Sequence, residues 1–192
     1  MKKLACLGLL AFAGCDGGNA AFNDAAAGVE GIYQVSAYTR NDAACAPGGD
    51  SQLGNDKFAV AFTQTIFGNH VLTVTSCASA ADCRAKLADM RANEPVLLDF
   101  QFAVSELAAN DVLVGFGAST GFSDGGVCRQ GEVTETKLEL IGSQLRIEQA
   151  ITFADDYAAE DGFCTTALAQ KNADGNACSQ LELLTAELLE VL

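Results

Sequence analysis

The chain has 192 residues, of which 25 are acidic and 11 are basic, so its formal net charge is −14. A surface this acidic repels phosphate backbones and anionic headgroups, which argues against nucleic acid as a partner of the folded part. The length suits one domain with its own core, and with only two prolines the sequence shows no interior linker.

The N-terminus has the layout of a secretion signal. Met1-Lys2-Lys3 is a short basic segment, and an apolar run from Leu4 to Phe12 follows it. This run is shorter than the ~20 apolar residues that a helix needs to cross a bilayer. We therefore predict a signal peptide over residues 1–14 and no membrane span within it.

The end of the apolar run reads Phe12-Ala13-Gly14-Cys15. It resembles the lipobox of bacterial lipoproteins, in which a branched apolar residue and two small residues precede an invariant cysteine, although Phe12 replaces the usual leucine. The resemblance implies cleavage before Cys15 and acylation of its thiol and new amino group. Two or more acyl chains give stable anchoring, so we expect a place in the bacterial cell envelope, on the inner or the outer membrane, with membrane lipid as partner.

An alternative cleavage site overlaps this motif. Ala11-Phe12-Ala13 also fits an ordinary secretory peptidase, whose cut before Gly14 releases a soluble protein. The chain has eight cysteines, and Cys6 leaves with the signal in either case. Acylation of Cys15 then leaves an even number to pair, whereas the soluble form keeps an odd one in an oxidising compartment. This parity favours the lipid-anchored form.

Residues 15–30 are rich in Gly, Asn and Ala, with Phe22 and Val29 as the larger apolar residues. This composition is typical of a flexible tether, which spans ~20 Å on average at this length. The folded domain is then expected over residues 31–192.

The remaining cysteines are Cys45, Cys77, Cys83, Cys128, Cys164 and Cys178. In an exported protein they are expected to form three disulfides, although six cysteines allow 15 pairings. Proximity in sequence suggests Cys77 with Cys83 and Cys164 with Cys178, and it leaves the other two to pair with each other. A zinc site is the alternative, but there is no C-x-x-C spacing and only one histidine. We therefore expect no metal and no cofactor.

Most of the chain alternates apolar and polar residues, as half-buried strands do. Seven strands are expected over residues 31–39, 57–67, 70–76, 96–104 and 111–117 and in the two arms of 136–153. The dipeptides Gly68-Asn69 and Gly142-Ser143 favour hairpin turns. The aromatic residues placed on the apolar faces are Phe58, Phe62, Phe100, Phe102 and Phe116.

Two segments have helical spacing. Residues 79–91 carry Ser79 as an N-cap and place Cys83, Leu87 and Met90 on one face, and residues 165–171 form a shorter candidate. The C-terminal residues 181–192 fit a helix or a strand. We favour the strand, because an eighth strand closes the sheet and removes both of its edges.

These elements predict a mainly β fold, a single antiparallel up-and-down β-barrel of about eight strands with one or two short helices, stabilised by disulfides. Gly31-Ile32-Tyr33 resembles the G-x-W motif of lipocalins, with Tyr33 in the place of tryptophan. The resemblance implies a lipocalin-like barrel, whose interior is either filled or holds one small ligand. Bulky inward residues favour the filled form, and the fold alone assigns no function.

No catalytic constellation is evident, and we do not expect an enzyme. The single histidine, His70, lies beside a predicted turn, and the acidic segment 154–163 lacks the ligand spacing of a calcium loop. Residues that would line a ligand cavity are Tyr33, Gln64, Phe100 and Gln149. Gln64 and Gln149 interrupt apolar faces, so they are either polar groups in a cavity or side chains paired within a filled core.

Three functions fit this sequence. The first is a membrane-anchored lipoprotein whose barrel is a binding module or a scaffold for an envelope protein. The second is a lipocalin-like carrier of a small apolar ligand, and the third is a carboxylate-dependent hydrolase. A cavity of several hundred Å³ favours a binding role, a packed centre favours a scaffold, and two carboxylates that converge in a cleft favour the hydrolase.

Overall fold

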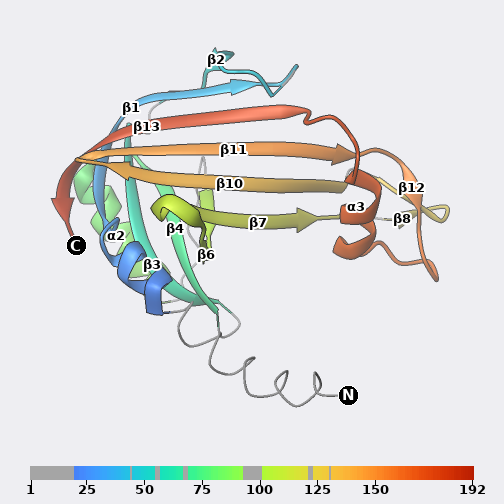
Figure 1. Cartoon of the computed structure of the whole chain (residues 1–192), viewed down its shortest axis with the longest axis horizontal. Coiled ribbons are helices and arrows are strands. Elements are labelled where there is room, and N and C mark those ends of the chain that lie inside the picture. Colours follow the sequence, from blue (N-terminus) through green and yellow to red (C-terminus); the bar gives the residue numbers. More distant parts are fainter. Residues whose placement is uncertain are drawn as a thin grey trace, which may run out of the picture.

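The computed structural model describes residues 20–192 apart from 44, 55–56, 67–68, 93–100, 121–122 and 130. Its main sheet contains β1 (Gly31–Asn41), β3 (Phe58–Ile66), β4 (Asn69–Cys77), β5 (Gln101–Val104), β6 (Glu106–Leu107), β7 (Leu113–Ser119), β10 (Gly131–Ile141), β11 (Gln144–Ala154) and β13 (Gln180–Val191), with β2 (Asp50–Ser51) beside β1. A small second sheet contains β8 (Ser123–Asp124), β9 (Val127–Cys128) and β12 (Tyr157–Ala158). The helices are α2 (Ala80–Arg91), α3 (Thr166–Ala173), the short 3-10 helix η1 (Ala109–Asp111) and a helix over residues 20–27 (Figure 1).

The main sheet closes on itself. Its order is β5-β4-β3-β1-β13-β11-β10-β7-β6, and its neighbouring strands pair antiparallel. Only Ser105 separates β5 from β6, so residues 101–107 run as one strand that pairs first with β4 and then with β7. The Ser105 amide donates a hydrogen bond of 2.9 Å to the Val114 carbonyl and continues this seam. With 101–107 as one strand, the described residues form the predicted up-and-down barrel of eight strands in chain order.

The seam depends on a glycine. A Cβ atom on Gly115 would lie 2.0 Å from the Ala103 carbonyl oxygen and 2.8 Å from the Val104 Cα. Only a residue without a side chain lets β5 and β7 approach this closely. The close approach of these two strands is what allows the barrel to close.

One end of the barrel, here called the closed end, is plugged by the helix over residues 20–27. Phe22, Ala26 and Val29 belong to the main core cluster, and the Tyr33 hydroxyl donates a hydrogen bond of 2.5 Å to the Val29 carbonyl. The structure therefore corrects the expected tether over its second half. Packing decides against flexibility here, because the two larger apolar residues of the segment, Phe22 and Val29, are buried inside the barrel.

The interior next to this plug is packed with apolar side chains. The largest of them, each less than 2% exposed, include Tyr33, Leu72, Phe102, Leu138, Leu145 and Leu184. These residues come from β1, β4, β5, β10, β11 and β13. This part of the barrel agrees with the filled interior that the sequence favoured.

The face of β3 that points into the barrel is not the one expected from the sequence. Ala59 and Ala61 face the interior, whereas Phe62 packs outside the barrel against Leu87 of α2, with Phe58 at the edge of the same cluster. Both faces of this strand are buried, so the alternation of residues does not show which face is inward. The interior takes the small residues because Tyr33 and other large side chains already occupy it.

The other aromatic residues expected in the core do not lie together. Phe102 is buried inside the barrel, but Phe116 is 64% exposed on the outer face of β7. Phe100 lies outside the described residues. Gly115 and Gly117 flank Phe116 in β7. These glycines, rather than Phe116, are at the inward positions of the strand.

The expected local elements are present. Ser79 caps α2 and accepts a hydrogen bond of 3.1 Å from the Asp82 amide, and the buried face of this helix includes Cys83 and Leu87. The short helix is α3, and the C-terminal segment is strand β13, paired with both β1 and β11. The hairpin at Gly142-Ser143 joins β10 to β11 as expected.

The disulfides are Cys45–Cys178, Cys77–Cys83 and Cys128–Cys164. The predicted pair Cys77–Cys83 is confirmed, but the predicted pairs Cys164–Cys178 and Cys45–Cys128 are wrong. The start of β13 lies beside the end of β1, which brings Cys178 next to Cys45. The second sheet likewise brings Cys164 to Cys128. Proximity in space, rather than in sequence, decides these two bridges.

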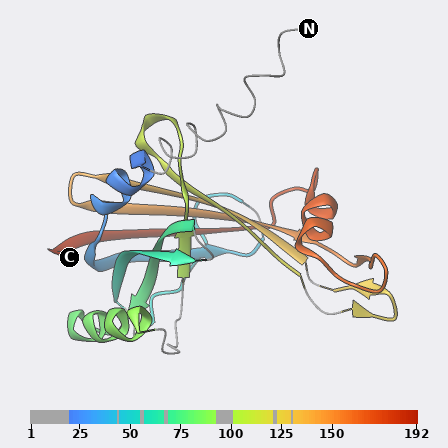
Figure 2. The same cartoon turned by 90° about the horizontal axis from the view of Figure 1, so that it is seen from below.

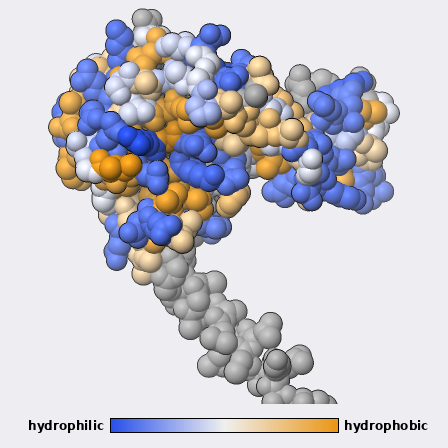
Figure 3. Space-filling view, turned by 45° about the horizontal axis from the view of Figure 1, so that its top comes forward, coloured by the Kyte–Doolittle hydropathy of each residue, from blue (hydrophilic) through white to orange (hydrophobic). Residues whose placement is uncertain are grey.

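The opposite end of the barrel, here called the open end, is built by long strands. β7, β10, β11 and β13 run past the rest of the barrel and carry α3 and the small second sheet, which form a separate lobe (Figures 1 and 2). The surface of this lobe is mainly hydrophilic (Figure 3). Within the described residues, no helix has the length and apolar character to cross a membrane.

Candidate functional site

The open end holds a cavity of about 560 Å³. Side chains from β1, β5, β10, β11 and β13 line it, so the cavity is an extension of the barrel interior. Its lining is rich in amide and carboxylate groups, which come from Gln52, Gln101, Gln149, Gln180, Glu132 and Glu182. We call this the mouth cavity.

The inward face of β13 shows how the interior changes from apolar to polar. Residues of one face alternate along a strand, and on this face Ala186 and Leu184 belong to the packed core. The next two inward positions towards the open end are Glu182 and Gln180, which line the mouth cavity. One strand therefore supplies both the core and the site.

Glu182 is the central group of the mouth cavity, and it is only 5% exposed. Its carboxylate accepts hydrogen bonds from the Tyr38 hydroxyl at 2.8 Å and from the Gln180 side-chain amide at 2.9 Å. A guanidinium nitrogen of Arg40 lies 2.6 Å from the same carboxylate. A buried carboxylate is stable when donors and a positive charge surround it in this way.

The environment also acts on Tyr38. Burial raises the pKa of its hydroxyl, and the negative charge of Glu182 raises it further. Tyr38 therefore remains a neutral donor to Glu182 over the physiological pH range. This pair fixes one wall of the cavity, because the ring of Tyr38 also packs edge-on against Phe102, with centroids 6.1 Å apart.

Arg40 is the basic side chain among the residues that line the mouth cavity. Besides its contact with Glu182, its Nε atom lies 3.4 Å from the Asp42 carboxylate. Two acidic groups thus compensate one positive charge. Arg40 is not available as a strong anion-binding group.

A second cavity of about 880 Å³ adjoins the first on the side of the outer lobe. Both cavities are lined by Glu132 and Phe153, and the second also by Ser119, Asp155 and Asp156. Asp156 forms an ion pair with Arg129. The two cavities together form a recess that runs from the barrel interior to the base of the lobe.

The structure separates the ligand-lining residues that the sequence suggested. Gln149 lines the mouth cavity and donates a hydrogen bond of 2.8 Å to the Thr136 hydroxyl. Gln64 instead donates to the Thr73 hydroxyl at 2.9 Å, away from the cavity, and Tyr33 is buried at the closed end. Phe100 and the candidate lipidation residue Cys15 lie outside the described residues.

Arg40, Gln101, Gln180 and Glu182 were missed by the sequence analysis. Gln180 and Glu182 lie on one face of their strand, but leucines occupy both faces, so the sequence alone does not show which face is inward. The strand expected over residues 181–192 includes Glu182 but begins after Gln180. The pairing of β13 with β1 and β11 places both groups on the inward face.

Two carboxylates line the mouth cavity, but the strand register keeps them apart. Glu182 is opposite Gln149, and Gln149 is opposite Thr136. Glu132 lies four residues farther along β10 than Thr136, or ~13 Å along the strand. Paired carboxylates of glycoside hydrolases are ~5–10 Å apart. This register supports binding more than carboxylate hydrolysis.

The remaining sequence candidates lie elsewhere. His70 is exposed at the start of β4, at the end of the barrel opposite the mouth cavity. Within the described residues, no group of three or more His, Cys, Asp or Glu side chains is arranged to hold a metal ion.

The chain was also compared with family models, curated proteins and solved structures, and no match was found in any of the three comparisons.

Proposed function

We propose that this chain is an exported, lipid-anchored protein of the bacterial envelope whose β-barrel binds a small polar molecule at its open end. The observation that carries the binding role is the mouth cavity of about 560 Å³. This volume lies within the usual range of small-molecule sites. Tyr38, Arg40, Gln180 and Glu182 hold one another in place, so this wall of the site exists before a ligand arrives.

The lining supports a polar ligand over an apolar one. Four glutamines face the cavity, Gln52, Gln101, Gln149 and Gln180. Each amide has donors and an acceptor, and a ligand must replace the water that these groups otherwise bind. The apolar part of the interior is filled by the core around Tyr33 and Phe102. A carrier of an apolar molecule would need that part to be hollow.

The lipid anchor is supported by Phe12-Ala13-Gly14-Cys15 and by the even number of cysteines that remain after Cys15. Residue 20 already belongs to the helix of the plug. Even fully extended, the chain from Cys15 to Ala20 spans at most ~18 Å. An acylated Cys15 would therefore hold the closed end of the barrel near the membrane, with the mouth cavity at the opposite end.

The anchor is tested by replacing Cys15 with Ala. The variant should lose labelling by a radioactive fatty acid and leave the membrane fraction, because no other acylation site is expected. Cys6→Ala, within the signal peptide, is the matched control and should keep both. Membrane-bound Cys15→Ala with its label intact would show that the anchor is not at this residue.

The binding role is tested by thermal unfolding of the full-length protein with fractions of a host-cell extract. A polar fraction should raise the Tm of the wild type, because a ligand that binds only the folded state stabilises it. The shift should be lost in Gln149→Ala and kept in Gln34→Ala, whose side chain is exposed on the outside of β1. Stabilisation by the lipid fraction alone would instead favour an apolar ligand, and no shift with any fraction would contradict binding.

A further inference from the structure

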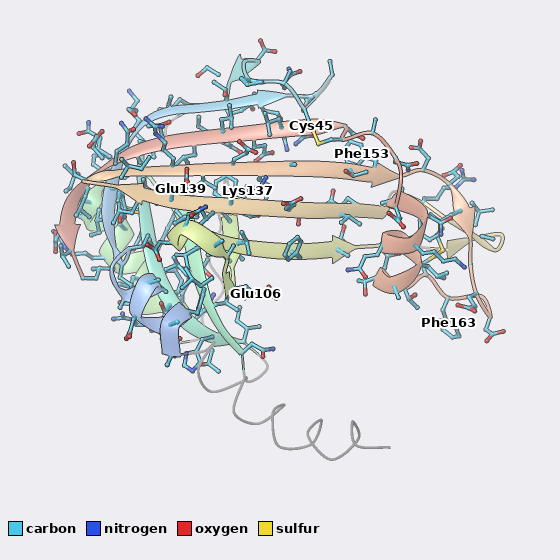
Figure 4. The ribbon with its side chains drawn as sticks, viewed as in Figure 1. Cys45, Glu106, Lys137, Glu139, Phe153 and Phe163 are labelled. Atoms are coloured by element: carbon cyan, nitrogen blue, oxygen red, sulfur yellow. A yellow bond between two sulfur atoms is a disulfide. The ribbon has the colours of Figure 1, made fainter. Side chains whose placement is uncertain are left out.

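Glu132 and Phe153 form a cross-strand pair inside the recess. They lie directly opposite each other in the antiparallel pair of β10 and β11. Directly opposed side chains stand on the same face with Cβ atoms ~4.5–5.5 Å apart. Both residues line both cavities, and Phe153 is 39% exposed there. Figure 4 shows Phe153 at the end of β11 next to the outer lobe.

The two carboxylates of the mouth cavity differ in their partners. Glu182 is compensated by Arg40 and by two hydrogen-bond donors. For Glu132, the described part of the chain supplies no hydrogen bond and no ion pair to the carboxylate. Arg40, the basic residue of the lining, is already occupied by Glu182 and Asp42. The negative charge of Glu132 therefore lacks a compensating group within the site.

We propose that the ligand carries an organic ammonium group, which binds between the Glu132 carboxylate and the ring of Phe153. This inference rests on the proposed binding function and names the class of its ligand. An aromatic face attracts a cation within about 6 Å of its centre, and a neighbouring carboxylate adds direct charge attraction. Asp155, which lines the adjoining cavity, increases the negative potential at the entrance.

The arrangement also orients the rest of the ligand. From Glu132 and Phe153, the inward positions lead to Thr134 and Gln180 and then to Gln149 and Glu182. The ammonium end is therefore outermost, and a hydrogen-bonding body extends towards the barrel interior. The formal net charge of −14 favours the approach of a cation.

A second carboxylate–aromatic pair shows what distinguishes this one. Glu135 and Phe116 are directly opposite on β10 and β7, but both are exposed on the outside of the barrel. Lys137 lies 3.6 Å from the Glu135 carboxylate and compensates its charge. In the described part of the chain, the same two residue types are thus directly opposite once inside a cavity, without a basic partner, and once outside, with one. The outer pair is a matched control.

The test uses choline and 3,3-dimethyl-1-butanol, in which carbon replaces the charged nitrogen of choline without changing its shape. Titration calorimetry on the full-length protein in mild detergent should show binding of choline and about tenfold weaker binding of the neutral isostere. Glu132→Gln should reduce choline affinity about tenfold, and Phe153→Leu severalfold, because each removes one of the two attractions. Neither change should alter the affinity for the isostere by more than about twofold.

Glu135→Gln and Phe116→Leu remove the same groups from the outer face and should bind choline like the wild type. Equal affinity for choline and the isostere, or unchanged choline binding in Glu132→Gln, would overturn the inference. If a polar extract fraction still raised the Tm of the wild type and not that of Gln149→Ala, the binding function would stand and only the ammonium assignment would fail.

An organic ammonium group reaches the site either as a free amine or as a lipid headgroup. The Cys15→Ala variant, with its anchor removed, is therefore sedimented with vesicles of phosphatidylcholine or of phosphatidylglycerol. Selective binding to phosphatidylcholine that Glu132→Gln abolishes assigns a headgroup, and binding of choline without vesicle binding assigns a free amine. Equal sedimentation with both vesicles and no choline binding would count against an ammonium ligand.

Discussion

The Tyr38 hydroxyl donates a hydrogen bond of 2.8 Å to the buried Glu182 carboxylate, and this contact joins β1 to β13 at the point where the interior turns from apolar to polar. A charged group is retained next to the core because Tyr38, Arg40 and Gln180 together replace its water. The contact therefore stabilises the barrel and also holds two residues of the mouth cavity in place.

Tyr38→Phe removes this hydrogen bond and leaves the ring in place. Because the acceptor is charged and buried, the free energy of unfolding should fall by about 1.5–3 kcal/mol. Tyr33→Phe is the control at the closed end, where the hydroxyl donates to the neutral Val29 carbonyl, and it should cost about 0.5–1.5 kcal/mol. Urea midpoints of both variants give the comparison, and a larger loss for Tyr33→Phe would contradict it.

The buried tyrosines also make stability depend on alkaline pH. Burial raises the pKa of Tyr33 from 10 to about 12 and raises that of Tyr38 as well. A folded-state pKa above the unfolded value means that the contribution is complete below pH 10 and is lost as the pH rises through the folded pKa. The urea midpoint should therefore fall from about pH 10 upwards.

Tyrosinate absorbance, recorded along the same titration, should lag behind that of the urea-unfolded chain. Tyr33→Phe should reduce the slope of stability against pH above 10, because one of the shifted groups is then missing. A midpoint that is constant up to pH 12 would show that these hydroxyls are accessible to solvent.

The three disulfides should differ in their contribution to stability. On the loop-entropy description, a bridge contributes more when it closes a longer loop. The sequence separations are 133 for Cys45–Cys178, 36 for Cys128–Cys164 and 6 for Cys77–Cys83. Replacing each pair by serines should therefore cost about 5, 4 and 2 kcal/mol respectively. Denaturant unfolding of the three double variants checks the order.

Peptide mapping without reduction checks the pairing itself. The expected products link the peptide of Cys45 to that of Cys178 and the peptide of Cys128 to that of Cys164. Because Cys45 follows Arg40 closely and Cys178 precedes Gln180, loss of the first bridge should also weaken ligand binding. A bridge between Cys164 and Cys178 would contradict the arrangement of β13 beside β1.

The sequence predicts the class of fold well and the partners of its elements less well. Alternation within each strand is a local signal, so the strands, α2 with its Ser79 cap and the hairpin at Gly142-Ser143 follow from it. Which face of β3 is inward depends on α2, a neighbour that the strand's own residues do not reveal. The same reason separates the correct bridge Cys77–Cys83, which is local, from the two bridges that depend on tertiary packing.

Only part of the mouth cavity could be predicted from the sequence. Gln149 could be recognised because it interrupts an apolar face, and the sequence left open whether a neighbour satisfies it. Glu182 could not be distinguished from an exposed acid, since 25 acidic residues are spread along the chain. Its burial follows from the pairing of β13 with β1, which places Arg40 opposite Glu182.

The plug over residues 20–27 gives the last prediction. Phe22 is 2% exposed within the main core cluster, although a composition rich in Ala, Asn and Gly suggested a tether. Phe22→Ala should lower the free energy of unfolding by about 3–5 kcal/mol, because it removes a buried ring and leaves a cavity at the closed end. Phe163→Ala, at a position that is 71% exposed in the outer lobe (Figure 4), should change it by no more than about 0.5 kcal/mol. Equal effects of the two substitutions on the denaturant midpoint would mean that the segment is a tether after all, and the distance between Cys15 and the barrel would then be longer than the plug allows.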